Sequence, residues 1–171
     1  MRGLIKGKVA VFIDAANLEL SAKDRGWRVD YLKLYSWLKT EFDVYFVGFY
    51  TARFDTQEHD RFLTFLKKTG YELSTKPLKE IRDRGNIKAH HRKANFDVEI
   101  AVDALSKRGL YKNLILFSGD SDFDYLVKYL RKAEKKVVVI SLKHHISREL
   151  IESADFYMDL KKIRKFIERK Q

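Results

Sequence analysis

Three aspartates follow one apolar segment of the chain. The run 114–117 ends at a Ser-Gly pair, and Asp120, Asp122 and Asp124 then occupy alternate positions. We expect this run to form a buried strand, and the segment 122–134, which has apolar residues at helical spacing, to follow it as a helix. Open α/β sheets bind their ligands beyond the carboxyl ends of their strands. The three acids therefore stand where a binding or catalytic site is expected.

Two further aspartates occupy comparable places. Asp14 directly follows the apolar run 9–13, and Asp97 falls in the first turn of a predicted helix. If both converge with Asp120 and Asp122, these like charges need a compensating proton or cation. Oxygen ligands without cysteine suit Mg²⁺ or Mn²⁺, and such ions activate water and stabilise the leaving oxygen of a phosphodiester. The pattern thus predicts metal-dependent phosphodiester chemistry.

Helix capping is an alternative explanation for any one of these aspartates taken alone. A carboxylate before a helix accepts the free backbone N–H groups and suits the helix dipole. Capping explains three acids in five positions poorly. A calcium loop of the EF-hand type is excluded, because the places of its glycine and its last glutamate hold Tyr125 and Arg131.

Composition narrows the class of protein. With 171 residues, 45% of them hydrophobic, the chain is expected to form one α/β domain over residues 1–171. The absence of cysteine excludes disulfides and thiolate metal sites. No apolar run reaches the roughly 20 residues that cross a bilayer, and no signal-peptide core precedes residue 9. We therefore expect no membrane partner and a cytoplasmic location.

The charge of the chain favours a polyanionic partner. The formal net charge is +11 and the isoelectric point is near 9.7, which favours nucleic acid over an anionic membrane. The most basic segment, 76–93, is expected to be a hairpin or mobile loop that could act as a nucleic-acid clamp. An ordinary solvated basic surface is the alternative in both cases.

Strand and helix patterns alternate along the whole chain. This alternation predicts a mostly parallel sheet with helices on both faces, in which the first and fourth strands must be neighbours if Asp14 and Asp120 are to meet. The segment 161–170 is expected to be an amphipathic tail helix that docks on its own sheet or on a second subunit, so a homodimer is possible. The expected strands are 9–13, 44–50, 71–75, 111–117, 136–140 and 155–158.

Aromatic residues are expected to serve mainly the core. Trp27 and Trp37 fit this role, whereas an exposed Tyr50, Phe54 or Tyr125 near the acids would instead suit base stacking.

Three short segments, 12–18, 93–98 and 118–123, together resemble the NYN domains, and specifically the LabA-like branch of the PIN-like nuclease superfamily. The late segment 147–155 is similar to the ending of that branch. The resemblance covers nearly the whole chain. It implies an α/β fold of the PIN-like (Rossmannoid) type, a three-layer sandwich with strand order 3-2-1-4-5 and a possible extra edge strand.

The resemblance also implies a metal-dependent ribonuclease that uses Mg²⁺ or Mn²⁺ and acts on single-stranded or structured RNA rather than DNA. A catalytically silent nucleic-acid-binding or assembly module on the same fold is the alternative. The implied catalytic and metal-binding residues are Asp14, Asp97, Asp120 and Asp122, with Asp124 as a possible outer ligand. The expected substrate-side residues are Asn17, Ser118, Ser121, Arg53, Lys88, Arg92 and Lys93.

Overall fold

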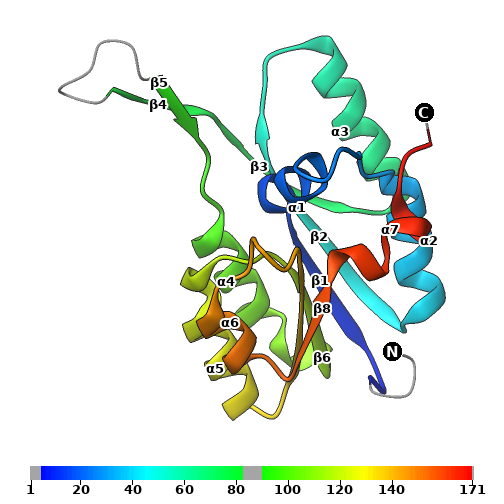
Figure 1. Ribbon diagram of the computed structural model, residues 1–171, viewed down its shortest axis with the longest axis vertical. Coiled ribbons are helices and arrows are strands. Elements are labelled where there is room, and N and C mark those ends of the chain that lie inside the picture. The colour runs from blue at the N-terminus through cyan, green and yellow to red at the C-terminus, as the bar shows by residue number, and fades with distance from the viewer. Residues whose placement is uncertain (1–4, 83–89, 171) are drawn as a thin grey trace.

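A six-stranded, wholly parallel sheet forms the centre of the molecule (Figure 1). The structure is a computed structural model that describes residues 5–82 and 90–170, with the side chains of 79–82 and 90–93 left aside. The strand order is β3-β2-β1-β6-β7-β8. Counted within this sheet, the order is 3-2-1-4-5 plus one edge strand, which confirms the predicted topology. The strands are β1 (Val9–Asp14), β2 (Val44–Arg53), β3 (Glu72–Pro77), β6 (Asn113–Phe117), β7 (Lys136–Ser141) and β8 (Phe156–Asp159).

Helices cover both faces of this sheet, as Figure 1 shows. One face carries α1 (Ala15–Lys23), α2 (Tyr31–Glu41), α3 (Gln57–Thr69) and α7 (Arg164–Ile167). The other face carries α4 (Asp97–Ser106), α5 (Asp124–Lys132) and α6 (Arg148–Ser153). Three short 3₁₀ turns, η1 (Arg108–Leu110), η2 (Ser121–Phe123) and η3 (Leu160–Lys162), complete these layers.

The alternation of side chains along the strands produces two separate cores. Val11 and Ile13 of β1 point into the core beneath α1 and α2, whereas Phe12 packs on the opposite face beneath α4 and α5. All three side chains are fully buried. A strand covered on both faces needs apolar residues at every position, which is why β1 and β6 read as continuous apolar runs.

Local signals set several helix boundaries. Asp30 accepts the backbone N–H of Lys33 at 3.0 Å and begins α2, and Thr56 accepts that of His59 at 3.2 Å and begins α3. Gly70 ends α3 in the left-handed conformation with φ of 115°, which glycine adopts without steric cost.

The basic segment forms a hairpin outside the main sheet. Strands β4 (Lys79–Arg82) and β5 (His90–Lys93) pair with each other in antiparallel fashion, and the hairpin projects from the body in Figure 1. The hairpin form of the prediction is therefore confirmed.

The prediction of a tail helix over 161–170 is wrong in extent. The segment forms η3 and the four-residue α7, after which Glu168 is extended and bridges to Val29. The backbone N–H of Asp30 also donates to the carbonyl of Ile167 at 2.8 Å. These pairings hold the tail against the start of α2. Ile163 and Ile167 are buried in the core of their own chain, whereas Phe166 is 48% exposed.

Within the described part of the chain, no helix combines the length and apolar composition that crossing a membrane requires.

Candidate metal centre and active site

The pairing of β1 with β6 brings the first acid beside the later cluster. The two strands are parallel neighbours, with Ile13 opposite Phe117. Asp14 and Ser118 therefore leave the sheet side by side at its carboxyl edge. The predicted adjacency of the first and fourth strands is confirmed.

Three carboxylates meet in front of this edge. Asp97 begins α4, and Asp120 and Asp122 lie at the start of η2. One oxygen from each carboxylate lies within 4.8 Å of the others. This spacing suits one cation held by three oxygens.

Asp14 lies behind this group rather than within it. Its Oδ1 accepts the backbone N–H of Asn17 at 3.2 Å, and its Oδ2 faces the hydroxyl of the fully buried Ser118 at 3.5 Å. The carboxylates of Asp97 and Asp120 are close enough for their charges to raise the pKa of Asp14. The structure thus places it next to the three-carboxylate group on its inner side.

Two polar side chains tie the loops of the site together. The Oδ1 of Asn17 accepts the backbone N–H of Gly119 at 3.1 Å. The Oγ of Ser118 accepts the backbone N–H of Asp120 at 3.2 Å. Asn17 and Ser118 therefore fix the geometry between Asp14 and Asp120.

The electrostatics of the site indicate an uncompensated negative charge. Burial, opposed by the backbone N–H of Asn17 and aided by the Asp97 and Asp120 carboxylates, raises the pKa of Asp14 to about 6. Burial also raises the pKa of Asp97, against a hydrogen bond from Asn95 and with the charges of Asp120 and Asp122.

Cationic partners for these acids are missing from the described region. Among residues 5–78 and 94–170, no lysine, arginine or histidine forms an ion pair with Asp14, Asp97, Asp120 or Asp122. The donor set is all oxygen, and its charge calls for a cation. The residues therefore fit a hard divalent ion such as Mg²⁺ or Mn²⁺.

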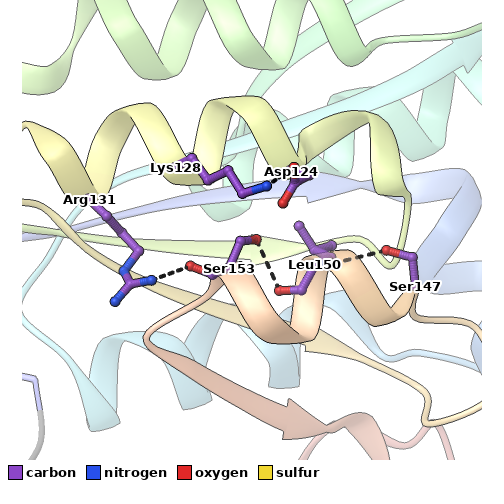
Figure 2. Close-up of polar contacts among 6 residues, drawn as sticks. All are labelled: Asp124, Lys128, Arg131, Ser147, Leu150 and Ser153. Atoms are coloured by element: carbon purple, nitrogen blue, oxygen red, sulfur yellow. Dashed lines mark hydrogen bonds and ion pairs between the residues drawn. The ribbon is translucent and has the colours of Figure 1, made fainter.

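Asp124 does not join the other carboxylates. Its Oδ2 pairs with the ammonium of Lys128 at 2.7 Å, one turn along α5, as Figure 2 shows. This contact holds the pKa of Asp124 below its ordinary value. Asp124 is not among the three acids whose oxygens lie within 4.8 Å of one another, so we leave it out of the proposed ligand set.

The predicted substrate-side residues are only partly gathered. Ser121 begins η2 beside the acids, but Arg53 at the end of β2 pairs with Asp60 of α3 at 3.4 Å. Arg92 and Lys93 belong to β5 of the projecting hairpin, and Lys88 lies outside the described residues.

Three of the aromatic residues considered above belong to the core, and two are exposed. Trp27 is buried and Trp37 is packed against the core, and Tyr50 is buried as well. Phe54 is 45% exposed and Tyr125, in the first turn of α5, is 80% exposed.

The sequence reasoning missed a group that positions Asp97. Lys76, at the end of β3, forms an ion pair with Glu99 and donates to the backbone carbonyl of Asn95 at 2.8 Å. The Oδ1 of Asn95 in turn accepts the backbone N–H of Asp97 at 2.8 Å. The place of Lys76 directly after a predicted strand was the available signal, since it puts the residue at the same edge of the sheet as Asp14.

Gly119 is required by a close approach of two loops. A Cβ atom here would lie 1.8 Å from the carbonyl oxygen of His145. The backbone N–H of Ser147 also donates to the carbonyl of Gly119 at 2.9 Å. The loop before α6 therefore rests directly on the turn that carries Asp120.

The late segment 147–155 has a structural role. Ser147 caps α6 through the N–H of Leu150 at 3.1 Å, and Asp155 accepts the N–H of Val137 at 2.8 Å. Arg131 of α5 bonds both Asp155 and the carbonyl of Ser153, the latter contact being visible in Figure 2. These contacts join α5, α6 and β7.

Three comparisons relate this chain to known proteins. The model of the NYN domain family matches residues 8–163. The low amplitude and bright protein LabA of Synechococcus elongatus is 34% identical over 164 residues, which cover 95% of this chain and 88% of that protein. A crystal structure of a protein of unknown function from Vibrio parahaemolyticus superposes with a TM-score of 0.78 at 26% identity, covering 95% of this chain and 96% of that one.

Proposed function

This chain belongs to the NYN domain family, within the PIN-like nuclease superfamily, and from its acidic site we propose that it is a metal-dependent ribonuclease. The observation that carries the proposal is the group Asp97, Asp120 and Asp122, whose ligand atoms lie within 4.8 Å of one another. The lack of a described cationic partner for this group supports a cation as its natural occupant.

We assign the residues of the site as follows. Asp97, Asp120 and Asp122 would hold Mg²⁺ or Mn²⁺, and Asp14 would support them from its inner position. Asn17 and Ser118 would keep these carboxylates oriented, as residues around metal ligands commonly do. When bound, the ion supplies a Lewis acid for the scissile phosphate and lowers the pKa of a water.

RNA is the proposed substrate because the positive net charge of the chain and its membership of the NYN domain family both favour a nucleic acid. The net charge of +11 favours a polyanion, and the basic hairpin β4-β5 projects from the body that carries the acids. We propose that Arg92 and Lys93 of this hairpin, together with Lys88, contact the RNA backbone.

The direct test is cleavage by purified protein. Labelled single-stranded RNA, duplex RNA and single-stranded DNA are incubated with the protein in Mn²⁺, in Mg²⁺ and in chelator. We expect metal-dependent cleavage of RNA that Asp97→Asn and Asp120→Asn abolish, a loss of at least about a hundredfold given the electrostatic role of the metal.

Asp124→Asn is the matched control. It removes the same charge a few residues along the chain, from a carboxylate that pairs with Lys128. This variant should retain cleavage. Absence of cleavage under every condition, with folding intact, would favour the silent binding or assembly module instead.

A further inference from the structure

A basic hollow lies at the far end of α1 from the acids. It has a volume of about 880 Å³ and is formed by the end of α1, the turn before α2, and the tail that follows α7. Seven of its lining side chains are lysine or arginine, and one, Glu168, is acidic. This size is typical of ligand sites, and the charge requires an anionic ligand.

The frame of the hollow is fixed by hydrogen bonds. The backbone N–H of Arg169 donates to the carbonyl of Arg28 at 2.9 Å, beside the bridge between Val29 and Glu168. The guanidinium of Arg164 bonds Glu168 through two contacts of 2.9 and 2.7 Å. Its centre also lies 5.7 Å from the ring of the buried Trp27. Arg164 and Glu168 therefore form the wall.

Four of the other six cations are available to a ligand. Lys23, Arg28, Arg169 and Lys170 are all exposed. Within residues 5–78 and 94–170, none of the four forms an ion pair with a carboxylate. Four cations around one fixed hollow repel one another, and a polyanion would relieve this repulsion.

Helix α1 connects the hollow to the acidic site. Its N-terminus is capped by Asp14, and its last residue, Lys23, lines the hollow. Nine helical residues span about 13 Å. We propose that the hollow binds the sugar-phosphate backbone of the RNA strand a few nucleotides away from the phosphate held at the acids. This inference rests on the proposed function.

The lining of the hollow favours phosphates over bases. Trp27 is the one aromatic residue among its described lining residues, and only 6% of it is exposed, beneath Arg164. Base recognition by single-strand binders depends on exposed aromatic platforms. The hollow therefore reads backbone charge, independently of base sequence.

The test compares two charge-reversal variants in an Asp97→Asn background, which prevents cleavage. Arg28→Glu with Arg169→Glu alters the hollow. Lys112→Glu with Lys136→Glu makes the same change in net charge at the opposite, amino edge of the sheet, where both lysines are exposed. Binding of fluorescent single-stranded RNA is measured by anisotropy at several salt concentrations, and thermal melts confirm folding.

We expect the hollow variant to bind an RNA of about 20 nucleotides at least tenfold more weakly than the control variant. The slope of log affinity against log salt should fall by about 1.4, since each lost phosphate contact on a single strand contributes about 0.7.

Equal affinity of the two variants for this RNA would overturn the proposal. The same substitutions in the parent background separate this inference from the proposed function. If Arg28→Glu with Arg169→Glu binds the long RNA as tightly as the control variant and still cleaves it, the nuclease is retained and the hollow is rejected. Specific loss of long-RNA binding without cleavage in any variant would retain the hollow and remove the nuclease.

Discussion

Asp14 and Asp120 each cap the start of a helical segment and also belong to the acidic site. One oxygen of Asp14 accepts the N–H of Asn17, and one oxygen of Asp120 accepts the N–H of Asp122 at 3.1 Å. Each cap uses one oxygen and thereby orients the other. Capping and metal binding are therefore compatible explanations for these positions, because the cap aligns the carboxylate.

Replacing Asp14 should change the pH dependence of stability. The pKa of Asp14 rises from 3.8 to about 6 on folding, so between these values the folded protein keeps a proton that the unfolded chain has released. The metal-free protein therefore loses stability as pH rises through this window. Between about pH 4 and pH 7.5, the free energy of unfolding of Asp14→Asn should therefore fall by about 1–3 kcal/mol less than that of the parent. Urea denaturation in chelator at both pH values measures it.

Asp43→Asn is the control for this experiment. It makes the same change at an exposed carboxylate at the amino end of the strands. Its stability should follow the parent across the pH range. If Asp14→Asn also follows the parent, Asp14 does not carry the buried charge we assign to it.

At the level of elements, the turn after β6 depends on the loop before α6. Gly119→Ala would place a methyl group 1.8 Å from the carbonyl oxygen of His145, so that loop must move. We expect a loss of at least about 2–3 kcal/mol in the free energy of unfolding, with weaker metal binding because Asp120 is the next residue. Gly109→Ala, with nothing within 4 Å of the added atom, should change stability by less than about 1 kcal/mol. Urea unfolding measures the stability of both variants, and titration measures their affinity for Mn²⁺. Equal stability of the two variants would contradict the close approach.

Asp155 links three elements and should prove structural rather than catalytic. Its two oxygens bond the backbone N–H of Val137 and the guanidinium of Arg131. Asp155→Ala leaves both donors without this partner, so we expect a loss of about 2–4 kcal/mol in stability. Below the melting temperature, cleavage should persist. A cleavage loss as large as that of Asp120→Asn in a folded Asp155→Ala protein would place Asp155 in the site instead.

Local patterns made much of this fold predictable. The apolar runs of β1 and β6 and the caps at Asp30 and Thr56 are encoded within a few residues of sequence. Parallel strands then bring their carboxyl ends to one edge, which is how Asp14 and Asp120 could be paired from the sequence.

The features that were missed depend on partners remote in sequence. Glu168 is extended because it pairs with Val29, and nothing in the tail itself indicates that end. Lys76 positions Asp97 through Asn95, across 19 residues. The ion pair of Asp124 with Lys128 differs, since the spacing of four residues is a local signal for it.

The net charge of the whole chain is opposite in sign to the charge of its acidic site. A chain of net charge +11 attracts RNA from a distance, yet the three-carboxylate group of Asp97, Asp120 and Asp122 repels a phosphate that approaches it. A divalent cation bound to this group would reverse that repulsion. Metal and RNA should therefore bind cooperatively, each raising the affinity for the other by the same factor.

This coupling predicts that removing two charges from the three-carboxylate group, by Asp120→Asn with Asp122→Asn, changes RNA affinity in opposite directions with and without metal. In chelator, the variant should bind RNA more tightly than the parent, because two repelling charges are gone. In Mn²⁺ at equal ionic strength, the order should reverse, since the parent gains about tenfold in affinity and the variant less than about twofold. Anisotropy recorded by stopped flow, before the RNA is cut, measures binding without turnover. If the parent binds RNA with the same affinity in Mn²⁺ and in chelator, the three-carboxylate group does not couple metal binding to RNA binding. Binding to the basic surface alone does not depend on an ion among the carboxylates.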